Sequence, residues 1–203
     1  MEPRMYIDAH HHLWRYDPIE YDWIDDSMQL LKQDFLIKEL EKTLYSNGFS
    51  SSIVVQARQS LDETQWLLEL AEKSTVIEGV VGWIDLKSEN LNKELSSFSH
   101  HKKLVGFRHV IQGETDPDFM RNPQFIQGLK TLAEFGYCYD LLIYAHQLPA
   151  AIEMLSHVPN LRVVVDHIAK PDIKTGDAYE QWVESMSKLA KNINCYCKLS
   201  GMV

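Results

Sequence analysis

The chain has 203 residues and a formal net charge of −9, with 45% hydrophobic and 24% charged residues. This length is enough for one sizeable core, or for most of a larger domain. The acidic balance argues against a nucleic-acid partner, because neutralising phosphates requires a basic face. The sequence has no run of about 18 apolar residues, so no membrane partner is expected.

The start of the chain and its cysteines bear on the compartment. Met1–Arg4 lead directly into a strand-like run, without the apolar stretch of a signal peptide. Cys138, Cys195 and Cys197 are odd in number and lie in strand-like runs, so they predict buried free thiols rather than a disulfide framework. We therefore expect a cytoplasmic protein.

Short apolar, β-branched runs alternate with longer amphipathic stretches along the chain. The runs predict strands at Met5–Ala9, Ser52–Ala57, Ile77–Ile84, Leu104–Val110, Tyr137–Tyr144, Leu161–Asp166 and Asn194–Leu199. Their near-continuous apolar character is typical of parallel strands buried on both faces. The amphipathic stretches predict helices at Asp34–Asn47, Leu61–Ser74, Leu91–Phe98, Asn122–Phe135, Leu148–His157 and Asp177–Lys191.

This alternation predicts an α/β fold with a parallel sheet and right-handed crossovers. An open doubly wound sheet and a TIM-type (β/α)8 barrel are the two candidates. A dinucleotide-binding sheet would carry Gly-x-Gly-x-x-Gly after its first strand, where this chain has three histidines, His10–His12. The polar strand ends favour the barrel, in which the chemistry lies at the carboxyl ends of the strands.

The length bears on how much of a barrel is present. A complete (β/α)8 barrel takes about 250 residues, whereas this sequence reaches Val203 as the seventh strand-like run finishes. We therefore expect a single domain over residues 1–203 that is a barrel truncated at its C-terminus after about the seventh strand. An open barrel exposes strand edges, so self-association into a homo-oligomer is also expected.

Asp8–His12 places two imidazoles one residue apart at the end of a predicted strand. Because side chains alternate faces along a strand, His10 and His12 should point the same way and His11 the opposite way. Two neutral imidazoles that converge on one point form half of a divalent-metal site. A surface histidine cluster is the alternative.

Polar residues recur at the ends of the other predicted strands. They are Gln56 and Arg58, Trp83 and Asp85, Arg108, His109 and Gln112, Tyr144 and His146, Asp166, His167 and Lys170, and Lys198 and Ser200. A single histidine at a strand end is by default a hydrogen-bonded packing residue. Histidines fall at four of the seven strand ends, and this recurrence favours a functional site.

Four ordered motifs resemble those of the amidohydrolase superfamily, and within it the amidohydrolase-2 branch of lactonases for sugar acids and pyrone dicarboxylates. They are Asp8–Trp14, Gly106–Gly113, Val165–Pro171 and Lys198–Gly201, and the resemblance covers essentially the whole chain. It implies a TIM-barrel enzyme that hydrolyses the lactone, a cyclic ester, of a sugar acid or related small carboxylate. A non-oxidative decarboxylase of the same superfamily and a non-catalytic fragment are the alternatives.

The resemblance also implies a metal site. His10, His12 and His167 would be the ligands of one divalent ion. Zinc is the first choice for histidine ligands and manganese the second, and relatives that work without tightly bound metal leave its occupancy open. Two-metal members carry a bridging lysine where this chain has Arg108 and His109, so one ion or none is implied.

Further roles follow from the same resemblance. Arg108, His109 and His167 are the predicted catalytic residues, which assist the attack of water on the lactone carbonyl. The predicted substrate-binding residues are Gln56, Tyr144, His146 and Lys198. Substrate specificity is expected in the loops Trp14–Asp26 and Arg58–Glu63. The aspartate base that the family carries on strand eight has no counterpart, so little turnover is expected from this chain.

Overall fold

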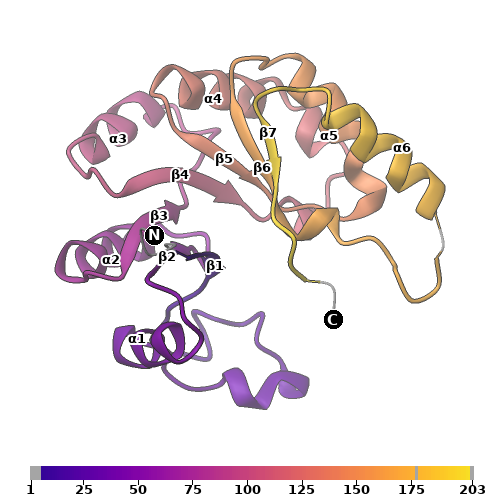
Figure 1. Cartoon of the computed structure of the whole chain (residues 1–203). Helices are drawn as coiled ribbons and strands as arrows, with labels where there is room; N and C mark the ends of the chain where they lie inside the picture. Colours follow the sequence, from indigo (N-terminus) through magenta and orange to yellow (C-terminus); the bar gives the residue numbers. More distant parts are fainter. Residues whose placement is uncertain (1–5, 177, 202–203) are drawn as a thin grey trace, which may run out of the picture. The chain divides into compact units, whose positions relative to one another are not determined.

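The computed structural model describes residues 6–176 and 178–201, and strands alternate with helices along it (Figure 1). The strands are β1 (Ile7–His11), β2 (Ser51–Val55), β3 (Ile77–Gly82), β4 (Leu104–His109), β5 (Cys138–Leu141), β6 (Arg162–Val165) and β7 (Cys195–Cys197). The helices are α1 (Ile37–Ser46), α2 (Leu61–Lys73), α3 (Leu91–Phe98), α4 (Pro123–Glu134), α5 (Leu148–Ser156) and α6 (Tyr179–Leu189).

The strands are parallel, as predicted. β1 pairs with β2, β2 with β3, β4 with β5, β5 with β6 and β6 with β7, in each case in the same direction. The order of the strands in the sheet follows their order in the chain. A helix connects each strand to the next, because parallel neighbours need a crossover. The carboxyl ends of neighbouring strands therefore lie at one edge of the sheet.

The described chain divides into two compact units. The first unit contains the residues up to Trp83 together with His101–Val105. The second unit contains Ile84–His100 and the residues from Gly106 onward. β4 begins in the first unit and ends in the second.

The core of the first unit lies between β2, β3 and α2, where Val54, Val80 and Leu67 are fully buried. The long connection after β1 is also ordered, because Trp14 pairs with Phe35 through two backbone hydrogen bonds of 3.0 and 2.9 Å. The Trp14 indole donates a further hydrogen bond to the Gln33 carbonyl at 2.8 Å. The end of β1 thus continues into a well-packed loop.

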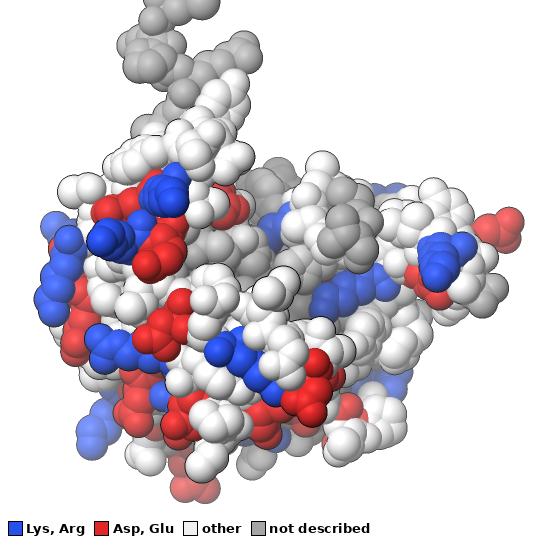
Figure 2. Space-filling model, turned by 90° about the horizontal axis from the view of Figure 1, so that it is seen from below, with Lys and Arg blue, Asp and Glu red and all other residues white. Residues whose placement is uncertain are grey.

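The core of the second unit lies between β4–β6 and their helices. Its fully buried side chains include Phe107, Leu129, Leu132, Tyr139 and Val163. No helix among the described residues combines the length and the apolar character that crossing a membrane requires. On the face shown in Figure 2, lysine and arginine side chains are interleaved with aspartate and glutamate rather than gathered into a basic patch.

Several element ends differ from the predictions. β1 runs on through His10 and His11, because its pairing with β2 resumes after a register shift at the pair His11 and Val54. Backbone pairing, rather than hydrophobicity, therefore sets the end of this strand. Met5 and Asp177, the predicted first residues of the first strand and the last helix, lie outside the described residues.

The cysteines are free thiols, as predicted, but they are less buried than predicted. Cys138 and Cys195 are partly buried, and Cys197 is exposed. β7 pairs with β6 on one side, and no other described strand covers its second edge. The prediction of buried thiols is therefore wrong for Cys197.

Candidate functional site

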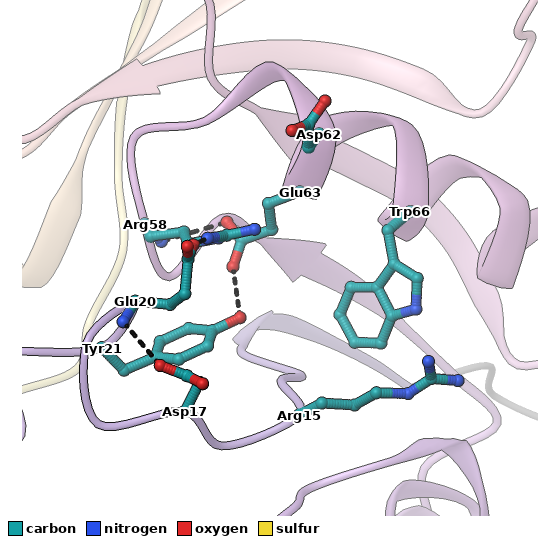
Figure 3. Close-up of a pocket in the computed structure, with 8 residues that line it drawn as sticks. All are labelled: Arg15, Asp17, Glu20, Tyr21, Arg58, Asp62, Glu63 and Trp66. Atoms are coloured by element: carbon teal, nitrogen blue, oxygen red, sulfur yellow. Dashed lines mark hydrogen bonds and ion pairs between the residues drawn. The ribbon is translucent and has the colours of Figure 1, made fainter.

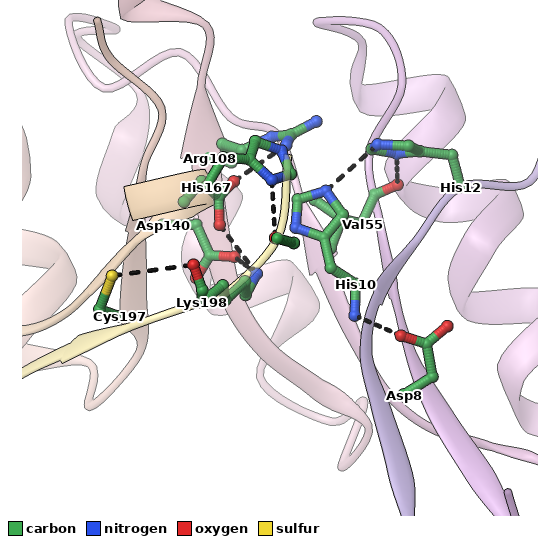
Figure 4. Close-up of polar contacts among 11 residues, drawn as sticks. Asp8, His10, His12, Val55, Arg108, Asp140, His167, Cys197 and Lys198 are labelled. Atoms are coloured by element: carbon green, nitrogen blue, oxygen red, sulfur yellow. Dashed lines mark hydrogen bonds and ion pairs between the residues drawn. The ribbon is translucent and has the colours of Figure 1, made fainter. Parts of the chain in front are cut away.

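The first unit places a pair of histidines at the carboxyl end of β1 (Figure 4). The Nε2 atoms of His10 and His12 face each other at 3.2 Å. The Nδ1–H of His12 donates to the Val55 carbonyl at the end of β2, at 2.8 Å. Because a carbonyl only accepts, this bond places the proton on Nδ1 and the lone pair on Nε2.

The geometry of this pair fits a metal site. Two nitrogens that lie about 2.0–2.1 Å from a tetrahedral zinc ion are about 3.3 Å apart, close to the 3.2 Å between the two Nε2 atoms. A backbone carbonyl on the other ring nitrogen is the usual partner that orients a ligating histidine. His12 therefore has the orientation of a zinc ligand, and the two Nε2 atoms have the spacing of two such ligands.

His11 points the opposite way, which confirms the predicted alternation. Its Nε2 lies 2.9 Å from the Ser52 hydroxyl on β2. Burial lowers the pKa of His11 to about 4, although the Asp8 carboxylate opposes this shift. His11 is therefore a neutral, hydrogen-bonded packing residue.

The second unit gathers four charged side chains at the carboxyl ends of β4–β7. The Arg108 guanidinium donates to Asp166 at 3.0 Å, and the Lys198 ammonium lies 3.0 Å from the other oxygen of Asp166 and also pairs with Asp140. Arg108 is 5% exposed and Asp166 is 0% exposed. Burial raises the pKa of Asp140 to about 6, the Asp166 charge adds to this shift, and Lys198 opposes it. We call Arg108, Asp140, Asp166 and Lys198 the buried ion group.

Two of the predicted functional residues thus lie in buried ion pairs. Two cations balance two carboxylates in this group, and such pairing is the condition under which charges are tolerated inside a protein. Arg108, predicted as catalytic, and Lys198, predicted as substrate-binding, are both fixed by Asp166. Sequence patterns gave no sign of Asp140 as a member of the group, because an aspartate inside an apolar run carries no motif.

His167 follows β6 in a turn with an unusual backbone. His167, Ile168, Ala169 and Lys170 have φ angles of 52°, 50°, 57° and 47°, all in the left-handed region. The His167 Nδ1 lies 2.8 Å from the Ser200 hydroxyl, which orients the ring through this nitrogen. Asp166, immediately before the turn, is engaged with Arg108 and Lys198.

His109 lies at the end of β4 in an aromatic environment. Its Nε2 donates to Glu114 at 2.5 Å, and its ring stacks on Phe119 at 4.8 Å between centroids. Burial lowers the pKa of His109, and the hydrogen bond to Glu114 opposes this shift. His109 is thus an imidazole oriented by a carboxylate, and the sequence did not single out Glu114 because no motif marks it.

The remaining predicted substrate-binding residues differ in exposure. Gln56 is fully buried, whereas Tyr144 is 41% exposed. Tyr144 stacks on the exposed His146, and the Lys170 ammonium lies 5.6 Å from the Tyr144 ring. Lys170 also donates to the Gln112 side chain at 2.7 Å. Tyr144 and His146 are therefore surface groups of the second unit, beside Lys170.

The first unit also contains a pocket of about 170 Å³ (Figure 3). The residues that line it are Arg15, Asp17, Glu20, Tyr21, Arg58, Asp62, Glu63 and Trp66. The Tyr21 hydroxyl donates to buried Glu63 at 3.1 Å, and Glu63 accepts the backbone N–H groups of Ala57 and Arg58 at 2.9 and 3.0 Å. Glu63 thus ties together the two loops in which the sequence predicted substrate specificity.

The parallel βα order and the histidines and cations at its strand ends define the class of protein. It is a TIM-type barrel enzyme of which the described residues provide seven strands. A sequence model of the amidohydrolase family matches residues 7–203. The chain belongs to the amidohydrolase family and is a hydrolase of that family.

Three relatives illustrate this membership. A Burkholderia ambifaria protein named L-fucono-1,5-lactonase is 33% identical over 97% of this chain and 67% of its own length. A Burkholderia multivorans protein of the same name is 36% identical over 97% of this chain and 68% of its own length. An amidohydrolase from Burkholderia multivorans, crystallised with bound zinc, superposes with a TM-score of 0.93 at 36% identity, over 98% of this chain and 71% of its own.

These comparisons confirm the resemblance on which the sequence analysis relied. The TIM-type fold is also confirmed, and the chain spans about two thirds of the length of its curated relatives. As an enzyme of this family it acts on a small-molecule substrate.

Proposed function

We propose that this protein hydrolyses the lactone of a sugar acid. The observation that carries this proposal is the pair His10 and His12, with Nε2 atoms 3.2 Å apart, in a chain 33% and 36% identical to two proteins named L-fucono-1,5-lactonase. A cyclic ester hydrolyses when water attacks its carbonyl, and this reaction needs a group that stabilises the developing negative charge.

We propose that His10, His12 and His167 hold one divalent metal ion, with zinc as the first candidate and manganese as the second. The donor set fits, because imidazole nitrogens suit zinc and two of the three rings have a partner on Nδ1 that orients Nε2. When bound, such an ion polarises a carbonyl or lowers the pKa of a water molecule. The chain's own residues bind the substrate and stabilise charge around it.

Arg108, His109 and Lys198 are proposed to act at the oxygens of the substrate. Asp166 fixes the directions of Arg108 and Lys198, so both cations are held in place before substrate binds. Such pre-organised donors stabilise a developing oxyanion without reorganisation, and the loss of one costs on the order of 10²–10³ in rate. His109, oriented by Glu114, is proposed to contact a substrate hydroxyl.

The pocket of the first unit supports a substrate with several hydroxyl groups. Its walls combine the rings of Tyr21 and Trp66 with carboxylates and guanidinium groups. Aromatic faces suit the C–H side of a sugar, and charged groups accept or donate hydrogen bonds to its hydroxyls. We propose that this pocket selects among sugar acids. Gln56, Tyr144 and His146 are proposed to bind the substrate.

We further propose a cytoplasmic protein in which residues 1–203 form one domain, without a nucleic-acid or membrane partner. The three free cysteines support the compartment, and the net charge of −9 supports the absence of a nucleic-acid partner. The exposed Tyr196 and Leu199 of the β7 segment support association with a second copy.

A lactone panel tests the proposed reaction. The chain is joined to the part of the Burkholderia multivorans relative that it does not span, because the chain covers 68% of that relative's length. We expect hydrolysis of at least one aldonolactone, measured as acid release, and its loss in His10→Ala. Failure on every aldonolactone and pyrone lactone would overturn the proposal, and release of carbon dioxide from an aromatic acid would favour the decarboxylase alternative.

A further inference from the structure

The turn after β6 is the most strained segment of the described backbone. His167–Lys170 are four consecutive residues with φ between 47° and 57°, and none of them is glycine. Each such residue costs free energy, because Cβ approaches the following carbonyl oxygen, and a β-branched residue such as Ile168 is a marked outlier. A run of this kind persists only where contacts from other elements over-determine it.

Ile168 receives those contacts on both of its backbone groups. Its N–H donates to the Lys198 carbonyl just after β7, at 3.2 Å. Its carbonyl accepts the indole N–H of Trp182 on α6, at 2.8 Å. Within the turn, the Lys170 N–H donates to the His167 carbonyl at 2.8 Å. The bond from Trp182 therefore links α6 to the residue that directly follows His167.

The His167 ring is bounded on another side by Ser200 and Gly201. The Ser200 hydroxyl lies 2.8 Å from Nδ1. A Cβ at position 201 would lie 2.9 Å from the His167 Cβ, closer than real Cβ atoms come, and 3.1 Å from its Cγ, which is tighter than most Cβ contacts. Only glycine allows this approach, so the ring has little freedom once the turn is fixed.

We infer that Trp182 is a positioning residue for His167. Its indole N–H holds the Ile168 carbonyl, which fixes the left-handed turn and thereby the direction in which the imidazole projects. α6 thus covers the sheet and also orients a side chain at the carboxyl end of β6. The inference rests on the proposed function in one respect: the direction of His167 matters because we propose that this residue binds a metal ion.

Two variants separate the indole N–H from the packing of α6. Trp182→Phe keeps an aromatic ring and removes the donor. Tyr179→Phe is the matched control, because the Tyr179 ring packs against Trp182 at 5.5 Å between centroids and has no described bond to the turn. Both are compared with the wild type by NMR of the His167 imidazole nitrogens, and by zinc affinity in competition with a chromogenic chelator.

We expect Trp182→Phe to shift the His167 nitrogen signals and to weaken zinc binding by about 10-fold or more, the usual effect of losing a group that orients a ligand. Tyr179→Phe should leave both unchanged. Gly201→Ala should disturb the same signals from the other side of the ring, while the Trp182 indole N–H stays protected from hydrogen exchange. Wild-type signals and affinity in Trp182→Phe would overturn the inference.

A second form of the experiment covers a failure of Trp182→Phe to fold. A tryptophan analogue with sulfur in place of the indole N–H keeps the two-ring shape, and it should reproduce the shift of the His167 signals. If the wild type binds no zinc, the proposed metal site is wrong, whereas the NMR signals still decide whether Trp182 positions His167.

Discussion

The histidines at the end of β1 and the histidine after β6 reach their positions in different ways. His10 and His12 lie at the carboxyl end of β1, where the register with β2 shifts between Asp8 and His11, and one hydrogen bond to the Val55 carbonyl fixes the His12 ring. His167 lies in a left-handed turn, next to Asp166 of the buried ion group. Its ring is hydrogen-bonded to the Ser200 hydroxyl. The first arrangement needs one bond between two neighbouring strands, and the second depends on contacts among several elements.

This difference determines what a substitution should disturb. Changes at the histidine pair remove ligand atoms but leave few buried groups without partners, so they should affect metal binding more than stability. Changes around His167 leave buried charges or strained peptides uncompensated, so they should affect stability as well. The largest expected effect therefore lies in the buried ion group.

Arg108→Met should lower the free energy of unfolding by about 3–5 kcal/mol, because it removes one partner of the fully buried Asp166 carboxylate. Urea unfolding measures the loss. The matched control is Arg121→Met, since Arg121 pairs with Asp118 and Glu153 but its side chain is 47% exposed. The control should lose much less, because exposed ion pairs contribute little to stability. Equal losses would contradict the contrast between the two regions.

His10→Ala and His167→Ala should each weaken zinc binding by about 100-fold or more, because each removes a nitrogen ligand. Loss of a group that only orients a ligand typically weakens binding by about 10–100-fold, and loss of the ligand itself should cost more. Metal content and zinc titration of the purified proteins measure this. His11→Gln is the control, because His11 faces Ser52 rather than the pair. If the wild type and all three variants carry the same metal load, the proposed ligand set is wrong.

Much of the fold was predictable, because parallel strands buried on both faces leave an almost continuous apolar signal. α3 was predicted with its observed bounds, Leu91–Phe98. β1 was placed too early, since its last residues are polar and only their pairing with β2 makes them a strand. The ends of elements depend on tertiary pairing, which a single sequence does not encode locally.

The candidate site was predictable in part for the same reason. Strand alternation put His10 and His12 on one side, and the structure confirms this. The left-handed turn at His167 was not predictable, because no glycine or asparagine marks it and its support comes from Trp182 and Lys198. Long-range contacts that impose an unfavourable local conformation leave no local signal.

The first unit contains a lysine, Lys103, whose ammonium group has several hydrogen-bond acceptors. Its substitution should have a smaller effect on stability. The Lys103 ammonium donates to the carbonyls of Ala71, Ser74 and Ile77 at 2.7–2.9 Å, at the end of α2 and in β3. Lys103→Met should lower the free energy of unfolding by about 2 kcal/mol, since charged donors contribute about 1.5–3 kcal/mol. Lys102→Met, which changes the exposed neighbouring lysine, should change the free energy of unfolding by about 0.5 kcal/mol or less. Equal effects of the two substitutions would show that the bonds from Lys103 to these carbonyls do not stabilise the fold.

The smallest expected effect is the pH dependence that His109 contributes to the second unit. Burial lowers its pKa in the folded state below the ordinary 6.5, and Glu114 limits the shift. As pH falls through 6.5, the unfolded chain therefore binds the proton first, so stability is full above 6.5 and declines toward the folded pKa. Unfolding midpoints at pH 7.5 and 5 should differ less in His109→Gln than in the wild type. His157→Gln, which changes an exposed histidine after α5, should keep the wild-type pH dependence. An unchanged pH dependence in His109→Gln would show that the bond to Glu114 raises the pKa of the folded imidazole as much as burial lowers it.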